Sequence, residues 1–190
     1  ERGQIKTHKA ISRSPIAVTE LLRIGEDLQA GRVNIRHVVN FSDQADVSEA
    51  EDKADEYLQW TLEGMVNIGK HYREGLKEWE KLAAEQKLAR GKASKKLLRL
   101  KRKVARTRLE ISQEIKNLNL KETARQRLIN AIAAAHKEVR DAEREIKKLG
   151  DKLEQKRLKP EAEKEYKPQL AAARRRLKKG EEDRHGSPVE

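Results

Sequence analysis

The chain has 190 residues, of which 36% are hydrophobic and 40% are charged, and its formal net charge is +12. So small an apolar share excludes a thick globular core and favours helices packed in a thin layer. The sequence holds no cysteine, which excludes disulfides and thiolate metal sites, and no apolar run approaches the roughly 18 residues of a membrane-spanning helix.

Runs in which apolar and polar residues alternate, the usual sign of a strand, are absent, whereas apolar residues recur at helical spacing over most of the chain. We therefore expect an all-α protein, an elongated helical bundle with a long antiparallel helical hairpin. We also expect it to be soluble and cytoplasmic, to have no membrane partner, and to need no cofactor.

The first helices are expected within residues 1–40. Ser14 is suited to cap free backbone N–H groups, and Pro15 loses no hydrogen bond at the first helical position, so a helix should begin there. Its apolar face ends near Gly31, a residue type common at helix ends. Asn34 follows as the cap of a second, short helix.

Acidic residues dominate the next segment. Residues 43–56 contain seven Asp and Glu against a single Lys, which reverses the charge of the chain as a whole. We interpret residues 41–50 as an acidic linker and residues 51–179 as the main helical bundle. The acidic segment would repel a phosphate backbone, so we do not expect it to contact nucleic acid.

A long helix is predicted over residues 48–91, because apolar residues recur there at helical spacing. Glycine in a helix interior costs about 1 kcal/mol relative to alanine. Three glycines, Gly64, Gly69 and Gly75, fall in the middle of this helix, so we expect a bend or a break there.

Two helices with regular apolar seams follow, over residues 92–117 and 121–158. The first seam is Leu97, Val104, Ile111 and Leu118, and the second is Leu128, Ile132, Ala135, Val139, Ala142, Ile146, Leu149 and Leu153. Because the connection between the two helices is short, we expect them to form an antiparallel hairpin within one monomeric chain. An intermolecular coiled coil would use the same seams.

Two prolines lead to predictions about the last helix. Pro160 should open it, since proline suits the first helical turn, and Pro168 should kink it near Leu170. Beyond the helical pattern, residues 180–190 combine charges, glycines and a proline, and we interpret them as a disordered tail.

No catalytic or metal site is expected from the sequence. The five histidines never occur as a pair spaced for two ligands on one helical turn, and no glycine-rich phosphate loop or serine-nucleophile turn is present. The many glutamates have Lys or Arg neighbours at helical spacing, which is typical of surface ion pairs rather than of a catalytic carboxylate pair. We therefore expect a chain without enzymatic activity.

The sharpest local feature is a basic run. Residues 87–108 contain eleven Lys and Arg and no acid, and such a run binds polyanions by releasing their counterions. The alternative is a solvated helix face that is neutralised by acids of a neighbouring helix or of residues 43–56. A second basic cluster occupies residues 174–179.

No aromatic residue interrupts either cluster, so any nucleic-acid contact should be to phosphates and independent of base sequence. We take the following residues as candidates for contact with nucleic acid or with another partner of the chain: Arg90, Lys92, Lys95, Lys96, Arg99, Lys101, Arg102, Lys103, Arg106, Arg108, Arg174, Arg175 and Arg176.

Several segments resemble one protein family. Residues 1–4 (ERGQ) and 10–18 (AISRSPIAV) are similar to the end of conserved region 1.2 of bacterial primary sigma factors and the start of their nonconserved region. Six further segments resemble the layout of that nonconserved region: ELL at 20–22, GEDL at 25–28, IRHVVNF at 35–41, LEIS at 109–112, LNLKE at 118–122 and RQRLI at 125–129.

This resemblance implies part of a subunit that joins core RNA polymerase, directs it to promoter DNA for transcription initiation and helps to open that DNA. In the family, the nonconserved region is a helical insertion that touches the largest polymerase subunit and DNA near the −10 element, assists promoter release and in some bacteria receives regulatory proteins. The family's strand-capturing aromatic region and its helix-turn-helix have no counterpart in this sequence. Our candidate residues therefore rest on charge alone.

Two other interpretations remain open. The chain could be a structural spacer, a helical hairpin whose charges serve solvation, or an independent nucleic-acid-binding coiled coil. Salt dependence separates them, because phosphate binding weakens steeply as ionic strength rises, whereas an interface built on an apolar seam does not.

Overall fold

The structure is a computed structural model that describes residues 2–41, 49–88, 94–154 and 160–185. Apart from one isolated bridge, the regular elements of these residues are helices, so the expected all-α class is confirmed. In chain order they are α1 (Arg2–Arg13), α2 (Pro15–Gln29), the short 3₁₀-helix η1 (Ile35–His37), α3 (Glu49–Leu88), α4 (Lys95–Asn117), α5 (Glu122–Leu153) and α6 (Pro160–His185).

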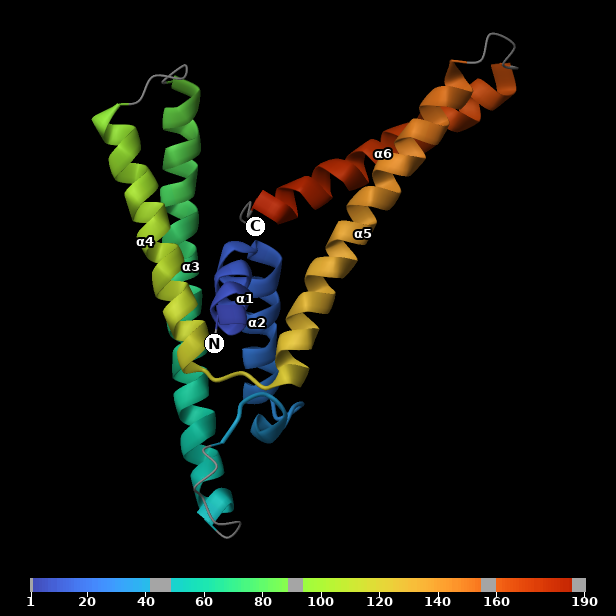
Figure 1. Ribbon diagram of the computed structural model, residues 1–190. Coiled ribbons are helices and arrows are strands. Elements are labelled where there is room, and N and C mark those ends of the chain that lie inside the picture. Colours follow the sequence, from blue (N-terminus) through green and yellow to red (C-terminus); the bar gives the residue numbers. More distant parts are fainter. Residues whose placement is uncertain (1, 42–48, 89–93, 155–159, 186–190) are drawn as a thin grey trace.

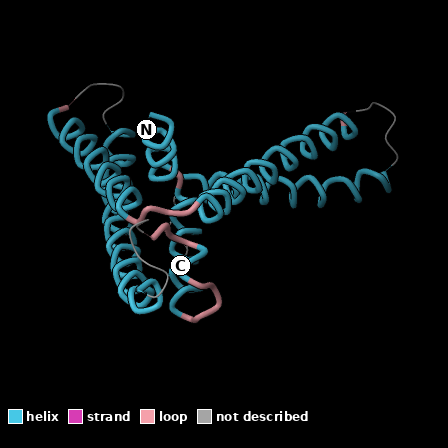
Figure 2. Tube along the Cα trace, turned by 60° about the horizontal axis from the view of Figure 1, so that its bottom comes forward, coloured by secondary structure: helices cyan, strands magenta, loops and turns pink. Residues whose placement is uncertain are grey.

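Two long helical hairpins diverge from a common base (Figure 1). One arm is the pair α3 and α4, the other is the pair α5 and α6, and α1 and α2 lie between the arms. The view in Figure 2 shows the same separation of the two arms. The molecule is thus an elongated helical bundle, as expected.

The expected pairing of the helices was wrong. We predicted that residues 92–117 pair with residues 121–158, but α4 packs along α3, and α5 packs along α6. The short connection between α4 and α5 does not reverse the chain direction onto α4. Instead it leads α5 away from α4. The apolar seam of α4 therefore packs against α3, and that of α5 packs against α6 over much of its length, although the seam pattern alone does not identify either partner.

Local start and stop signals at the amino-terminal helices are confirmed. The Ser14 hydroxyl accepts a hydrogen bond from the Ala17 backbone N–H at 3.4 Å, and Pro15 is the first residue of α2. Gly31 follows the end of α2 with a φ of 68°, a left-handed conformation that costs glycine little. The Asn34 side chain caps η1 by accepting from the Arg36 N–H at 2.9 Å.

The expected break in the long helix does not occur, because α3 is continuous from Glu49 to Leu88. Its glycines lie where neighbouring helices approach closely. A Cβ placed on Gly64 would come within 2.8 Å of Leu118 Cδ2, and one on Gly69 would come within 3.3 Å of Leu22 Cδ2. The loss of helix propensity at these positions is therefore offset by close packing.

The main core lies at the base of the two arms, where α2 packs against α3 and the start of α5, and α1 packs against α4. Its most deeply buried side chains are Ile11, Val18, Leu21, Ile24, Val39, Ile68, Ile115, Leu118 and Leu128. A second, smaller cluster further along the first arm joins Leu82, Leu97 and Val104, with Trp79 and Leu100 packed against them. The seam predicted for residues 97–118 is therefore buried, but it serves two separate clusters.

A short crossing of two connections joins the base to both arms. The Asn40 N–H donates to the Asn119 carbonyl at 3.0 Å, and the Lys121 N–H donates to the Val38 carbonyl at 2.8 Å. Asn119 adopts a φ of 46°, which turns the chain between α4 and α5. We call these two segments, residues 38–40 and 119–121, the crossing.

The seam of α5 is covered by two partners in succession. Near its start, Leu128 packs into the main core, and further along Val139, Ala142 and Leu149 are buried where α6 runs beside α5. A Cβ on Gly180 of α6 would meet Val139 Cγ2 at 2.6 Å, so the two helices approach closely there. The predicted seam is correct, and its partners are α2 and α6.

The last helix begins at Pro160, as predicted, but its carboxyl-terminal end departs from the sequence expectation. α6 runs without interruption through Pro168 to His185, so residues 180–185 are helical rather than part of a tail. Residues 41–50 were expected to form an acidic linker, but Glu49 and Ala50 already belong to α3. The rest of the expected acidic linker, residues 42–48, and the rest of the expected tail, residues 186–190, lie outside the described residues.

Among the described helices, none has a stretch long and apolar enough to cross a membrane.

Close packing at Gly64 gives a first testable prediction. Replacing Gly64 with alanine should lower the free energy of unfolding by about 1–2 kcal/mol, because the cost of overpacking against Leu118 exceeds the gain in helix propensity. The matched control is Gly150→Ala on α5, where an added Cβ meets nothing within 4 Å, and this change should raise stability by about 0.5–1 kcal/mol. Urea unfolding followed by circular dichroism measures both, and equal effects of the two changes would contradict the packing.

Candidate polyanion-binding surface

α4 carries a basic face directly opposite its buried seam. Ser94 caps the helix by accepting from the Leu97 N–H at 3.0 Å, and the helix then runs for 23 residues. With 3.6 residues per turn, four basic side chains spaced by four, three and four positions fall on the side away from the seam. We call these exposed residues, Lys95, Arg99, Arg102 and Arg106, the basic stripe.

The basic stripe has no partner of opposite charge among the described residues. None of its four side chains forms an ion pair there, and the first acid on α4 is Glu110. Like charges three or four positions apart on a helix repel each other. The stripe is therefore a concentrated positive charge about 17 Å long that no ion pair with the described residues compensates.

One flank of α4 is partly neutralised by the neighbouring helix. Lys96 Nζ lies 2.7 Å from Glu85 Oε2, and Lys103 Nζ lies 3.6 Å from Glu78 Oε1. Both lysines are nevertheless largely exposed, so these pairs contribute little to stability. The neutralisation alternative thus applies to the flank that faces α3 and leaves the basic stripe unpaired.

The acidic start of α3 does not reach the basic stripe. Asp55 and Glu56 are exposed there, whereas α4 runs beside α3 only as far as the contact between Gly64 and Leu118. About 33 Å of helix separate Glu56 from Glu78, which exceeds the Debye length of about 8–10 Å at physiological salt. The two charged regions of the first arm act separately.

The candidate residues fall on separate surfaces. Lys101 and Arg108 are exposed on the second flank of α4, whereas Arg174, Arg175 and Arg176 are exposed on α6, which belongs to the other arm. Arg176 Nη2 lies 2.8 Å from Glu145 Oε2 of α5, so part of that cluster is used within its own arm. Arg90 and Lys92 lie outside the described residues. The structure thus brings together the candidates of α4 and does not join them to those of α6.

Sequence reasoning missed the aromatic residues near one basic residue. Tyr72 and Trp79 of α3 line a small cavity together with Arg108 of α4. The two aromatic residues are seven positions apart and share one helix face, but their approach to Arg108 becomes visible only when the partner of α4 is known. Burial raises the pKa of the Tyr72 hydroxyl, and a hydrogen bond with Thr19 opposes that rise.

Other chemistry has little support from the described side chains. Within this part of the chain, no three His, Asp or Glu side chains gather closely enough to hold a metal ion. Comparison of the sequence and structure with models of protein families, with curated proteins and with solved structures finds no match. The basic stripe is therefore the feature on which a function is best argued.

The repulsion within the basic stripe leads to a prediction about stability. Changing Lys95, Arg99, Arg102 and Arg106 together to glutamine removes the three like-charge pairs within the stripe and three more with Lys96 and Lys103, each of which destabilises a helix by about 0.2–0.5 kcal/mol. Thermal and urea unfolding at low salt should therefore show a variant that is as stable as the native chain or more stable. A clear loss of stability would mean that these side chains make contacts within the fold and are not free for a ligand.

Proposed function

We propose that this chain is a non-catalytic binding module that contacts the phosphate backbone of DNA through the basic stripe of α4. The observation that supports this most strongly is the alignment of four exposed, unpaired basic residues on one helix face. Duplex DNA carries one negative charge per about 1.7 Å of its axis, so a stripe about 17 Å long faces several phosphates at once. Three of the four residues are arginines, whose planar guanidinium binds phosphate oxygens in pairs.

The stripe is suited to phosphates rather than to bases. It contains no aromatic side chain for stacking and no amide side chain for reading adenine; its arginines can pair with guanine in the major groove, but all four of its side chains bind phosphate. Phosphate contacts position a protein on DNA without selecting a sequence. We infer that this surface strengthens or orients a complex whose sequence selectivity comes from elsewhere.

The setting that we propose for this contact is transcription initiation in bacteria. The segments that resemble primary sigma factors include both residues of the base and residues of the two arms, and in that family the corresponding region touches core RNA polymerase as well as promoter DNA. The exposed acids Asp55 and Glu56 lie on the same arm as the basic stripe but far from it. We infer that the acidic end faces a polymerase surface and that the basic stripe faces DNA.

DNA binding should depend steeply on salt, and the basic stripe should set that dependence. Converting Lys95, Arg99, Arg102 and Arg106 to glutamine should reduce the slope of log Kd against log salt by about 3–4, since each phosphate contact contributes about 0.9. The matched control changes Lys137, Arg140, Lys147 and Lys148 of α5 to glutamine, which removes the same charge from exposed positions of the other arm. Fluorescence anisotropy with a short duplex at several salt concentrations gives both slopes.

If the two variants lowered affinity and slope equally, net charge rather than the position of the stripe would explain DNA binding. If neither variant changed binding at low salt, the phosphate-contact proposal would be wrong, and a structural spacer would describe the chain better. Sequence-independent binding is expected, so a scrambled duplex of equal length should bind equally well.

The polymerase contact is tested separately by retention on immobilised bacterial core RNA polymerase. The native chain should be retained, and charge reversal of Asp55 and Glu56 to lysine should reduce retention at least tenfold, because an attraction becomes a repulsion. The control reverses Asp141 and Glu143, which are exposed acids of α5. Absence of retention for the native chain would contradict the sigma-factor interpretation. The proposed DNA contact would then rest only on the salt dependence of duplex binding.

A further inference from the structure

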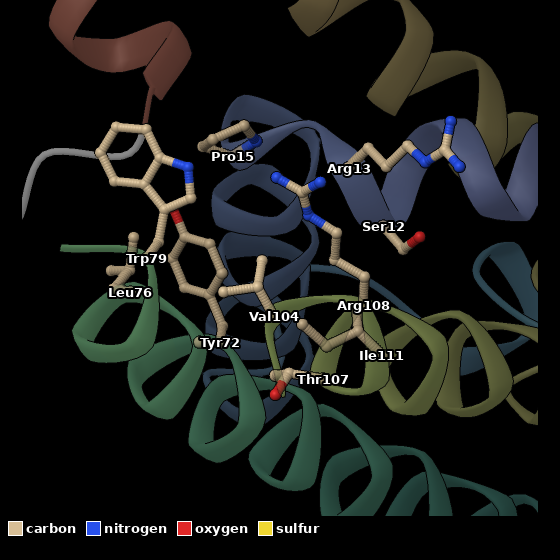
Figure 3. A pocket seen from close by; sticks show the side chains of 11 residues that line it. Ser12, Arg13, Pro15, Tyr72, Leu76, Trp79, Val104, Thr107, Arg108 and Ile111 are labelled. Atoms are coloured by element: carbon tan, nitrogen blue, oxygen red, sulfur yellow. The ribbon is translucent and has the colours of Figure 1, made fainter. Parts of the chain in front are cut away.

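A cavity of about 210 Å³ lies where the junction of α1 and α2 meets the first arm (Figure 3). Three segments of the chain line this cavity. The α1–α2 junction contributes Arg13 and Pro15, and α3 contributes Tyr72 and Trp79. α4 contributes Val104, Arg108 and Ile111. Residues about 95 positions apart in the sequence thus border one space.

The cavity exists because the two apolar clusters of the first arm do not meet. Tyr72 packs against the main core, whereas Trp79 packs against the cluster further along the arm. Between them, α3 and α4 present the small residues Gly75 and Thr107, and a Cβ on Gly75 would come within 3.1 Å of Thr107 Cγ2. The backbones are thus close here, but no large side chain fills the space beside them.

The electrostatics of the cavity favour an anion. Arg13 and Arg108 are both exposed, and neither forms an ion pair with another described residue. The residues that line the cavity include no Asp or Glu. Figure 3 shows the Arg13 guanidinium turned away from Trp79 and Arg108, so the Arg108 guanidinium is the group placed to donate charge-assisted hydrogen bonds to an anion in this space, and Arg13 adds positive charge at longer range.

The walls of the cavity favour a flat apolar body. Val104 and Ile111 are buried and form an apolar lining, and the rings of Tyr72 and Trp79 border the space on the α3 side. Figure 3 shows the Arg108 guanidinium between Trp79 and Arg13, below Pro15. An aromatic ring stacks well on tryptophan and on a guanidinium plane, whereas an aliphatic anion would use the apolar walls less fully.

We propose that this cavity binds a nucleotide, with the base against Trp79 and the phosphate held by Arg108. The volume of about 210 Å³ is below that of most drug-sized ligand pockets, so the cavity holds the base alone, and the sugar and phosphate lie outside it beside the exposed Arg108. The nucleotide is either free or part of a single strand, since both present the same base and phosphate. This site does not depend on the basic stripe, because Arg108 lies on the flank of α4 and Arg13 on another helix.

Trp79 supplies the measurement. The chain has two tryptophans, and changing the exposed Trp60 to phenylalanine leaves Trp79 as the sole tryptophan, which can be excited without the tyrosines. In this variant, deoxyadenosine monophosphate should quench Trp79 fluorescence saturably when tryptophan is excited at a wavelength that adenine does not absorb. Inorganic phosphate alone should compete without quenching, and deoxyadenosine should bind more weakly than the nucleotide.

Variants of the arginines make the test specific. Arg108→Gln should raise the Kd for the nucleotide by about tenfold or more, as expected for loss of a charge-assisted hydrogen bond, and Arg13→Gln should raise it less. The matched control is Arg99→Gln, which removes the same charge from the opposite face of α4 and should leave the Kd within about twofold. Tighter binding of a short oligodeoxyadenylate than of the mononucleotide would identify a strand as the source, and equal binding would identify the free nucleotide.

Two results would overturn the nucleotide site. One is that neither deoxyadenosine monophosphate nor the oligodeoxyadenylate quenches Trp79 fluorescence. The other is that Arg108→Gln and Arg99→Gln weaken the quenching equally. The Arg99→Gln variant also separates this site from the proposed function. It should weaken duplex binding and spare the nucleotide, whereas Arg108→Gln should chiefly affect the nucleotide. Failure of one proposal is therefore distinguishable from failure of the other.

Discussion

The crossing between residues 38–40 and residues 119–121 is the constraint on which the rest of the structure depends. Besides its two backbone hydrogen bonds, Lys121 Nζ donates to the Arg36 carbonyl at 2.7 Å, and the Thr123 hydroxyl donates to the His37 carbonyl at 2.7 Å. One turn further, Arg127 of α5 lies 2.7 Å from Glu20 and 3.0 Å from Asp27 of α2. Hydrogen bonds from Arg32 and Arg127 hold the pKa of the Asp27 carboxyl below its usual value, so its ion pair with Arg127 persists to a lower pH than an unperturbed carboxyl would allow. These contacts fix the start of α5 on α2 and direct it away from α4.

This constraint explains why the basic stripe is exposed. If α5 had folded back along α4, as the short connection suggested, the acids of α5 would have been available to the bases of α4. Instead α4 uses one side for α3, and its partners there neutralise Lys96 and Lys103 but not Arg99 or Arg106. The divergence of the arms thus leaves a row of like charges unpaired, which supports a polyanion as the missing partner.

Local features of the fold could be predicted from the sequence, because caps and apolar seams are encoded by neighbouring residues. Ser14, Asn34 and the seam of α4 behave as expected. The pairing of the helices could not be predicted, since a seam shows which face is buried and not which helix covers it. The same limit applies to the glycines of α3 and to the cavity beside Trp79, because each depends on residues that approach from distant segments. For the basic residues, the sequence predicted their charge, and the structure shows which of them have acids nearby.

The central claim is that α4 presents its basic stripe to DNA phosphates. The most direct test is an NMR titration of the chain with a short duplex at low salt, observing the arginine Nε–Hε groups. The account predicts that the signals of Arg99, Arg102 and Arg106 shift together and return when salt is raised, while that of Arg140 on α5 does not move. Shifts confined to arginines of α5 and α6, or equal shifts over the whole surface, would contradict it.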